Sequence, residues 1–267
     1  MTPRDSATEK GLQAELTRGL RGRRALVTGA ASGLGRAMAD ALTESGTTTF
    51  YADIDEGKAT SAAKSAGTAA SPLGIDVTDL ASVRRAFGQA TADGPLDILV
   101  CSAGISRANW IEEMQIEEWD AVLRTNLTGA FLCCQAAVPG MLQQKWGRIV
   151  NVASIAATWA PRPKRFDGGY NYSASKAGVL GMTVRLAVEL APHGITANCI
   201  SPGIMQTPLT KHALEDPVTR KAAVDSIPMG RLGEPGDLCA LLLFLCCDGS
   251  SYLTGQNIVI DGGYSLW

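Results

Sequence analysis

Short apolar runs alternate with longer stretches of helical periodicity along this chain of 267 residues. The apolar runs occupy residues 25–27, 48–51, 96–100, 148–152, 195–200 and 257–260, with a seventh near 70–75. Their length and their bounding turns are typical of β-strands. The stretches between them predict helices at about 33–45, 56–65, 79–90, 117–144, 171–192 and 234–247. Such alternation predicts the α/β fold class, with one doubly wound domain in which about seven parallel strands are covered by helices on both faces.

Two stretches interrupt this alternation. Residues 1–20 precede the first strand, and we expect them to form a mobile or surface-lying extension of a domain that spans 21–267. The stretch 204–230 contains Pro208, Pro217 and Pro228 and is long for a connector. Long connectors beside a site often act as lids, so the sequence predicts a lid segment at about 204–230.

Composition and charge favour a small-molecule partner. Apolar side chains make up 46% of the chain, which is enough for a large buried core. The net charge of -2 provides no broad basic field for nucleic acid or for an anionic membrane surface. No run approaches the roughly 18 apolar residues that a membrane span needs, and the polar N-terminus lacks the apolar block of a secretory signal. We therefore expect a cytoplasmic protein that binds neither nucleic acid nor membrane.

The cysteines and histidines do not suggest a metal site. The seven cysteines include no C-x-x-C pair, and neither of the two histidines stands beside a cysteine or carboxylate at ligand spacing. Most of the cysteines lie among apolar residues, where a free thiol behaves as a small hydrophobe in a reducing compartment. We therefore expect no bound metal.

A glycine-rich turn directly follows the first predicted strand. Glycines stand at 29, 33 and 35, where a helical pattern begins, although a flexible turn alone would look the same. Asp53 ends the second strand about twenty residues on, where a carboxylate can accept the hydroxyl groups of an adenosine ribose. This carboxylate would repel a 2′-phosphate, and no basic residue stands close by to receive one, since Ser32 precedes the second glycine and Ile54 follows the acid. We therefore predict NAD rather than NADP. The predicted contacts here are Gly29, Ser32, Gly33, Leu34, Gly35 and Asp53.

Tyr172 and Lys176 stand four residues apart in a predicted helix, so their side chains share one face. A phenol titrates near about 10 and becomes a base at neutral pH only where a positive charge favours the phenolate. Lys176 can supply that charge, although two such residues on a solvated helix face would show the same spacing. Ser154, just after the strand at 148–152, offers a hydroxyl partner. The chain therefore contains the parts of an acid–base site.

Taken in order, these motifs resemble those of the classical short-chain dehydrogenases/reductases. The likeness spans about residues 20–263. It also rests on Asp76-Val77, Ala103-Gly104, Asn126, Pro202-Gly203 with Thr207, and Asp261-Gly-Gly263. One departure precedes Ala103, where Cys101-Ser102 replaces the family's usual Asn-Asn. The resemblance implies a Rossmann-type fold and an oxidoreductase that uses a dinucleotide.

The resemblance also implies a role for each matching residue. It places Asp76 and Val77 at the adenine, and Ala103 and Gly104 along the path of the ribose and nicotinamide. It places Met205 and Thr207, which follow the turn Pro202-Gly203, at the carboxamide. Lys176 would also grip the nicotinamide ribose, and Asn126 would hold a water that links Lys176 to solvent. The implied catalytic set is Asn126, Ser154, Tyr172 and Lys176.

Together these roles form a mechanism for alcohol oxidation. NAD accepts the hydride, Tyr172 removes the hydroxyl proton, and Ser154 donates a hydrogen bond to the substrate oxygen. Each unit by which the pKa of the phenol falls corresponds to about 1.4 kcal/mol of phenolate stabilisation. Lys176 and the oxidised nicotinamide must therefore supply several kcal/mol in a shielded cleft. We predict an NAD(H)-dependent oxidoreductase that interconverts a secondary alcohol and a ketone.

Two segments bear on the substrate and on assembly. Arg162, Lys164 and Arg165 lie beside the predicted site, and they either receive an anionic substrate or form a solvated loop. The chain ends in Trp267, which either packs on its own subunit or reaches a neighbour. Similar tails occur in polyol and sugar dehydrogenases of the family that the chain resembles, many of them tetramers. We therefore favour a sugar or polyol as the small-molecule substrate and a homotetramer, with a homodimer as the alternative.

Two other functions stay open. Reduction of 3-oxoacyl thioesters is the main enzymatic alternative. A non-catalytic nucleotide-binding scaffold is the other, but such proteins usually lack part of the catalytic set, and this chain has all four residues of it.

Overall fold

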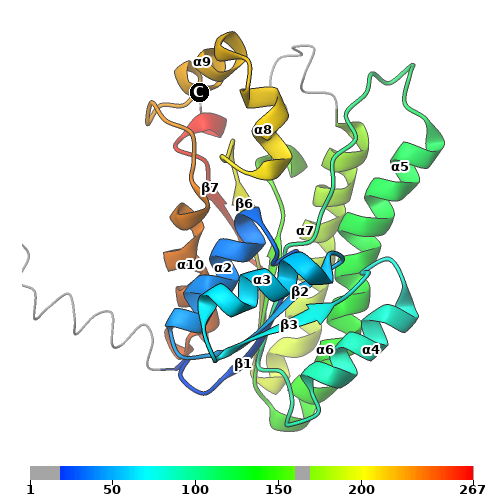
Figure 1. Ribbon diagram of the computed structural model, residues 1–267, viewed down its shortest axis with the longest axis vertical. Helices are drawn as coiled ribbons and strands as arrows, with labels where there is room; N and C mark the ends of the chain where they lie inside the picture. The colour runs from blue at the N-terminus through cyan, green and yellow to red at the C-terminus, as the bar shows by residue number, and fades with distance from the viewer. Residues whose placement is uncertain (1–18, 160–168, 267) are drawn as a thin grey trace, which may run out of the picture.

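Seven parallel strands form one sheet in the order β3-β2-β1-β4-β5-β6-β7 (Figure 1). The computed structural model describes residues 19–159 and 169–266. The strands are β1 (Arg24–Thr28), β2 (Thr48–Asp53), β3 (Ala70–Gly74), β4 (Ile98–Cys101), β5 (Gly147–Val152), β6 (Ile195–Pro202) and β7 (Asn257–Ile260). The predicted parallel sheet is confirmed, including the strand near 70–75, which is β3.

Helices cover both faces of this sheet, as the sequence predicts. They are α2 (Gly33–Glu44), α3 (Glu56–Ala66), α4 (Leu80–Ala90), α5 (Ile116–Leu123), α6 (Gly129–Gln144), α7 (Tyr170–Leu190), α8 (Pro208–Leu214), α9 (Pro217–Asp225) and α10 (Cys239–Cys246). Short 3-10 turns follow or precede several of them: η2 (Ile155–Ala157), η3 (Ala191–His193), η4 (Pro235–Leu238), η5 (Asp248–Ser250) and η6 (Tyr264–Leu266).

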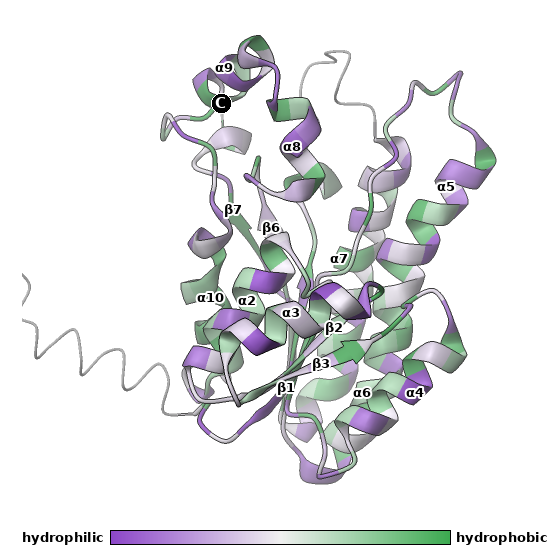
Figure 2. Cartoon of the chain, viewed as in Figure 1, coloured by the Kyte–Doolittle hydropathy of each residue, from purple (hydrophilic) through white to green (hydrophobic). Residues whose placement is uncertain are grey.

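The two faces of the sheet build separate cores. On one face Leu26 and Leu99 pack with α4, α6 and α7. On the other face Val27 and Val100 pack with α2, α3 and α10. Neighbouring residues of one strand enter opposite cores because successive side chains of a strand point to opposite faces. Figure 2 shows the buried α10 in hydrophobic colours, whereas exposed turns of α4 and α5 carry hydrophilic ones.

The topology places a binding edge beside β1. This strand pairs with β2 on one side and with β4 on the other, so the chain order reverses there. Thr28, at the end of β1, is in register with Ala52 of β2 and with Cys101 of β4. In open α/β sheets, ligands bind at such a point, outside the carboxyl ends of the strands. The loops that leave β1, β2 and β4 therefore start at one common edge.

Two predicted helices differ in detail from the expectation. The helix predicted at 117–144 is interrupted by the π-turn η1 (Arg124–Thr128), in which the Gly129 N–H donates to the Arg124 carbonyl. Such turns widen a helix locally and are frequent at functional sites. The helix predicted at 234–247 starts as the 3-10 turn η4, after which the Cys239 N–H donates to the Gly236 carbonyl and the chain continues as α10.

The predicted lid stretch folds into two short helices. Both α8 and α9 begin with a proline, at Pro208 and Pro217, where the missing N–H costs no hydrogen bond and the fixed φ suits a helix start. In Figure 1 these helices rise above the carboxyl end of the sheet.

Of the predicted extension at 1–20, residues 1–18 lie outside the described residues. Gly19 and Leu20 are described, and the Leu20 side chain is buried in the core on the α2 face. Across the helices of the described ranges, none combines the length and the apolar character that crossing a bilayer requires.

Candidate active site

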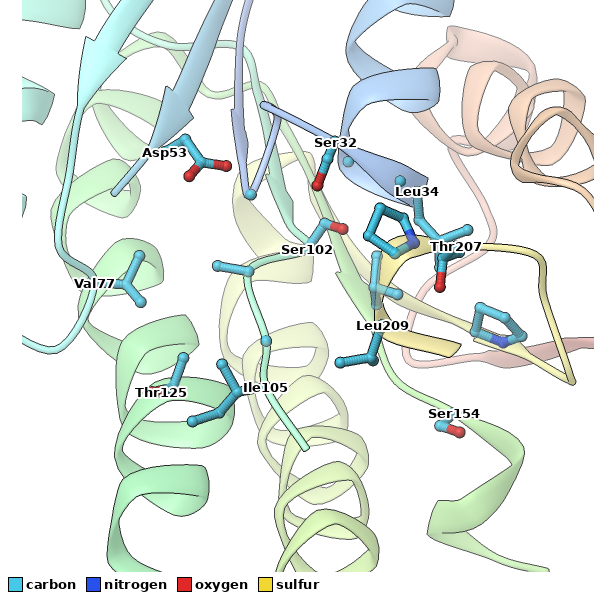
Figure 3. Close-up of a pocket in the computed structure, with 18 of the residues that line it drawn as sticks. Ser32, Leu34, Asp53, Val77, Ser102, Ile105, Thr125, Ser154, Thr207 and Leu209 are labelled. Atoms are coloured by element: carbon cyan, nitrogen blue, oxygen red, sulfur yellow. The ribbon is translucent and has the colours of Figure 1, made fainter. Parts of the chain in front are cut away.

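A cleft of about 410 Å³ lies at the carboxyl ends of the strands. Asp53 stands at one end of it and Ser154 at the other (Figure 3). The predicted residues on its wall are Gly29, Ser32, Gly33, Leu34, Gly35, Asp53, Asp76, Val77, Ala103, Gly104, Ser154, Tyr172, Lys176, Pro202, Gly203, Met205 and Thr207. The fold thus brings into one cavity residues from the ends of six strands, and the cavity has the size of a small-molecule site.

The glycine turn has the geometry that a pyrophosphate needs. Gly29 and Gly33 have φ of +70° and +56°, which are left-handed conformations that favour glycine. A Cβ at Gly35 would overlap the carbonyl oxygen of Gly29, so no side chain fits where α2 leaves the turn. The start of α2 consequently presents bare backbone N–H groups to the cleft. This turn fits the phosphates of a dinucleotide.

The Asp53 carboxylate is held in place at the end of β2. One of its oxygens accepts the Ala31 N–H at 3.0 Å and the other accepts the Asp55 N–H at 3.1 Å. Two nearby cations are engaged elsewhere, since Arg36 pairs with Asp40 at 2.7 Å and Lys58 with Asp55 at 2.8 Å. The end of the cleft at Asp53 is therefore suited to hydroxyl groups rather than to a further phosphate.

The next strand end closes this side of the cleft. Asp76 accepts hydrogen bonds from the Thr78 N–H at 2.9 Å and from the Thr78 hydroxyl at 2.7 Å, which folds the loop after β3 upon itself. A Cβ at Gly129 would lie 2.7 Å from the Val77 side chain, so this glycine lets the helix approach Val77 closely. Val77 and Thr125 face the cleft from this side in Figure 3.

Ser154 and Tyr172 meet at the opposite end of the cleft. Ser154 directly follows β5 and Ala153, and its hydroxyl oxygen accepts the Ala156 N–H at 3.2 Å as the cap of η2. Tyr172 lies in the first turn of α7, and its phenol is close enough to Ser154 for the serine hydroxyl to lower the pKa of the phenol. The strand end and the helix start therefore fix the two hydroxyl groups against each other.

Lys176 is buried one helical turn after Tyr172. Its ammonium donates a hydrogen bond to the Val152 carbonyl at 2.7 Å and lies 5.6 Å from the centroid of the Tyr172 ring. Burial lowers the pKa of Lys176 to about 8. The proximity that the four-residue spacing predicts is thus present, with the ammonium anchored on the end of β5.

The expected lowering of the Tyr172 pKa by Lys176 is not what the structure shows. Burial raises the pKa of Tyr172, and the Ser154 hydroxyl opposes that rise only in part. The physical reason is that desolvation of the phenolate is the larger effect, while the Lys176 ammonium points at a backbone carbonyl. A further positive charge in the cleft is needed to make this phenol a base at neutral pH.

Asn126 lies behind the cleft wall rather than on it. It is in the π-turn η1, and its amide pairs with the backbone of Ile105, accepting the N–H at 2.8 Å and donating to the carbonyl at 3.0 Å. It also donates to the Ser175 hydroxyl at 3.1 Å. A Cβ at Gly104 would be 3.3 Å from the Asn126 Oδ1 and 3.7 Å from the Lys176 Nζ. Asn126 and Lys176 therefore stand near each other beneath Gly104.

Several residues on the cleft wall were missed by sequence reasoning. Ile105 and Thr125 lie across the cleft from Leu209, which belongs to α8 and is 53% exposed (Figure 3). The others are Ile54, Ile75, Thr78, Ser102, Val152, Ala153, Pro208 and Thr210. A signal did exist for α8, because Thr-Pro-Leu-Thr at a helix start places an apolar side chain beside the predicted Thr207. A Cβ at Gly33 would lie 3.3 Å from Pro208, so α8 rests on the glycine turn.

An aromatic pair links the segment after Ser154 to the C-terminal segment. The rings of Trp159 and Tyr264 meet edge to face, with centroids 4.6 Å apart. Asp261 holds the chain there by accepting the N–H groups of Gly263 at 2.9 Å and Ser265 at 2.8 Å. The C-terminal segment thus folds back on its own subunit. The basic run at 162–165 and Trp267, for which the sequence left two interpretations each, lie outside the described residues.

The cysteines carry no sign of metal chemistry. All seven are free thiols, and the structure as described holds no group of three His, Cys, Asp or Glu side chains arranged to bind a metal ion.

Comparison with known proteins gives consistent matches along almost the whole chain. A family model described as "Enoyl-(Acyl carrier protein) reductase" matches residues 29–265. The chain is 37% identical to the 3-oxoacyl-[acyl-carrier-protein] reductase FabG of Vibrio harveyi over 91% of its own length and 98% of the relative. It is 41% identical to a D-threitol dehydrogenase of Mycolicibacterium smegmatis over 92% and 94%. A crystal structure of a short-chain type dehydrogenase/reductase from Mycobacterium marinum superposes with a TM-score of 0.87 and 37% identity, over 96% of this chain and all of that one.

Proposed function

The chain belongs to the short-chain dehydrogenase/reductase family and is an oxidoreductase, and we propose that it interconverts a secondary alcohol and a ketone with NAD(H). The observation that carries the proposal is that Ser154, Tyr172 and Lys176 line the same cleft as the Asp53 carboxylate. One end of this cleft suits the adenosine of a dinucleotide, and the other offers acid–base chemistry.

In this proposal Tyr172 takes the proton of the substrate hydroxyl, and Ser154 donates a hydrogen bond that holds the substrate oxygen. When bound, the oxidised nicotinamide supplies the hydride acceptor and a positive charge. Lys176 contributes a second positive charge and stays fixed by the Val152 carbonyl. Each unit by which these charges lower the pKa of the phenol corresponds to about 1.4 kcal/mol of phenolate stabilisation. The burial that raises the pKa of Tyr172 also keeps water from screening those charges.

The glycine turn and the neighbouring strand ends would hold the cofactor. We assign the phosphates to the turn at Gly29, Gly33 and Gly35, with Ser32 and Leu34, and the adenosine ribose to Asp53. We assign the adenine to Asp76 and Val77, the ribose–nicotinamide path to Ala103, Gly104, Tyr172 and Lys176, and the carboxamide to Met205 and Thr207 beside Pro202 and Gly203. All of these residues line the cleft.

Asn126 is proposed to complete the catalytic set by holding a water that links Lys176 to solvent. Its place beneath Gly104 and close to Lys176 supports that role. Its hydrogen bonds with Ile105 give it a second task, which is to fix the cleft wall at the start of the loop after β4.

For the substrate we favour a polyol or sugar, in keeping with the D-threitol dehydrogenase relative. The test is a panel of polyols, aldoses, hydroxy acids and 3-hydroxyacyl thioesters, offered with NAD and with NADP, while reduced cofactor is followed by absorbance. We expect oxidation of at least one polyol or sugar with NAD. Turnover with NADP equal to or above that with NAD would contradict the cofactor assignment.

Reduction of 3-oxoacyl thioesters is the second candidate. The FabG relative, matched over 98% of its length, favours it. Activity on an acyl thioester and on no polyol would select this candidate. A non-catalytic scaffold is disfavoured because Ser154, Tyr172 and Lys176 converge in one cleft, and it predicts no turnover across the panel while NAD still binds.

The pH dependence of oxidation tests the pairing of Lys176 with Tyr172. At saturating NAD we expect the rate to rise with pH, because only the ionised phenol acts as a base. Lys176→Ala should move the midpoint of this rise to higher pH by about one unit or more, since loss of a positive charge raises the pKa of the phenol. The measurement is kcat from pH 6 to 10, with the exposed Lys64→Ala as the control. An unmoved or more acidic midpoint would remove Lys176 from this role.

We also propose a homotetramer, or a homodimer, that assembles through α6 and α7. Both helices leave large apolar side chains uncovered, with Phe131, Val184 and Val188 at 48%, 52% and 65% exposure. Exposed apolar surface of this kind often marks a protein–protein interface. Light scattering that gives the mass of one chain would contradict the assembly.

A cytoplasmic location is proposed as well, because seven unpaired thiols suit a reducing compartment. Recovery of the protein in the membrane or secreted fraction of its cells would contradict it.

A further inference from the structure

Asn171, the residue before the proposed base, is buried with no exposed surface and contacts three points of another segment. Its Nδ2 donates to the Arg107 carbonyl at 3.0 Å and to the Glu118 carbonyl at 3.2 Å, and it lies 3.4 Å from the Met114 sulfur. Its Oδ1 accepts the Tyr172 N–H at 2.7 Å. One side chain therefore joins the start of α7 to the chain that precedes and opens α5.

The segment it contacts, residues 102–115 between β4 and α5, has little regular structure of its own. After the end of β4 it runs without helix or strand to a turn at 111–113 and then to α5. It projects beyond the body of the domain above α5 (Figure 1). Ile105, near its start, lies on the cleft wall. A segment of this kind needs contacts from outside itself to keep one shape.

Asparagine is the residue type that suits this place. The N–H of Tyr172 is one of the first four of α7 and has no acceptor within the helix, so Oδ1 satisfies it. The two hydrogens of Nδ2 face only acceptors, namely two backbone carbonyls and a thioether sulfur. An aspartate would still accept the Tyr172 N–H, but its second carboxylate oxygen would face the Arg107 and Glu118 carbonyls with no hydrogen to donate.

We propose that Asn171 is a positioning residue that fixes the 102–115 segment against Tyr172, so that the substrate side of the cleft is preformed around the base. This inference rests on the proposed function, since it assigns the segment to the substrate. Asn126 fixes the same segment at Ile105, and Asn171 fixes it farther along at Arg107 and Met114 and also contacts the first turn of α5 at Glu118. Both anchors tie the segment to α7, because Asn126 donates to the Ser175 hydroxyl and Asn171 belongs to α7 and accepts the Tyr172 N–H.

The kinetic test compares Asn171→Ala and Asn171→Asp with a matched buried asparagine. Asn198 is also without exposed surface and bonds two backbone groups, the Leu253 carbonyl at 2.8 Å and the Gln256 N–H at 3.0 Å, but it is on β6 and outside the cleft. With the best substrate of the panel we expect both Asn171 variants to raise KM about tenfold or more and to lower kcat, while the Kd for NAD stays within about twofold. Asn198→Ala should leave KM and kcat unchanged. Rates are expressed per NAD-binding site, so that unfolded protein is not counted.

A second readout does not need activity. We expect amide hydrogen exchange across residues 105–115 to become about tenfold faster or more in both Asn171 variants and to stay unchanged in Asn198→Ala. Met114→Leu, which keeps both carbonyl contacts, is the milder variant and should speed exchange by about twofold.

The outcomes separate the two proposals. Wild-type exchange rates in the Asn171 variants, or wild-type KM and kcat in Asn171→Asp, would overturn the positioning role even if the enzyme is an alcohol dehydrogenase. A wild-type protein that oxidises none of the alcohols would contradict the proposed function. The exchange measurement would still report whether Asn171 orders residues 102–115.

Discussion

Replacing Tyr172 with phenylalanine is expected to lower the rate of alcohol oxidation by about 10² to 10⁴-fold, the range that loss of a general base usually produces. The change removes one oxygen atom from a partly buried ring, so the packing of α7 should be kept. The Kd for NAD should stay within about twofold, because Asp53 and Ser32 of the glycine turn lie at the end of the cleft away from Ser154, the neighbour of the phenol (Figure 3). The measurements are steady-state rates with the best substrate and NAD titration by fluorescence.

Tyr170 provides the matched control for this variant. It is on the same helix two residues earlier, and its side chain is 42% exposed, so Tyr170→Phe removes the same atom from solvent rather than from the cleft. We expect wild-type rates from it. If Tyr172→Phe retains a tenth or more of the activity, Tyr172 is not the base.

Asp53→Ala is expected to reverse the choice of cofactor. Hydrogen bonds to a charged group contribute about 1.5–3 kcal/mol, so losing the contact with the adenosine ribose should lower kcat/KM for NAD by about 10- to 100-fold. The same change removes the negative charge that opposes a 2′-phosphate, so kcat/KM for NADP should rise. The measurement is kcat/KM with each cofactor at one fixed, saturating alcohol concentration.

Asp216 is the control for Asp53, because it is a carboxylate that caps α9 through the Thr219 N–H at 2.8 Å and does not line the cleft. Asp216→Ala should cost about 1 kcal/mol of stability from the lost cap and leave the preference between NAD and NADP unchanged. An Asp53 variant that keeps the wild-type ratio of kcat/KM values would show that another feature of the cleft selects the cofactor.

The sheet was predictable because its strands are short apolar runs with clear borders. The strand predicted at 148–152 is β5 (Gly147–Val152), and the strand near 70–75 is β3 even though it contains Pro72. Proline is tolerated in β3 because this strand is at the edge of the sheet and pairs only with β2. The π-turn at Arg124–Thr128 was not predictable, because one inserted residue leaves the spacing of apolar side chains on either side almost unchanged.

The site was predictable where chemistry is tied to local spacing. The glycines at the end of β1 and the pair of Tyr172 and Lys176 are of this kind. Asn171 was missed because its partners lie more than fifty positions away along the chain, and no local pattern reveals which asparagine will be buried. The direction of the Tyr172 pKa was missed for a related reason, since it depends on how completely the folded chain removes water from the phenol.

Because β1 lies between β2 and β4, the two ends of the cleft are formed by different parts of the chain. Residues up to position 78 form most of the end at Asp53, and residues after position 104 supply Ser154, Tyr172 and the predicted lid segment at 204–230. If the proposed roles hold, changes in the later part can alter the substrate while Asp53, assigned to the adenosine ribose, keeps the preference between NAD and NADP. A hybrid gene joined between these two parts should inherit its coenzyme from one parent and its alcohol from the other.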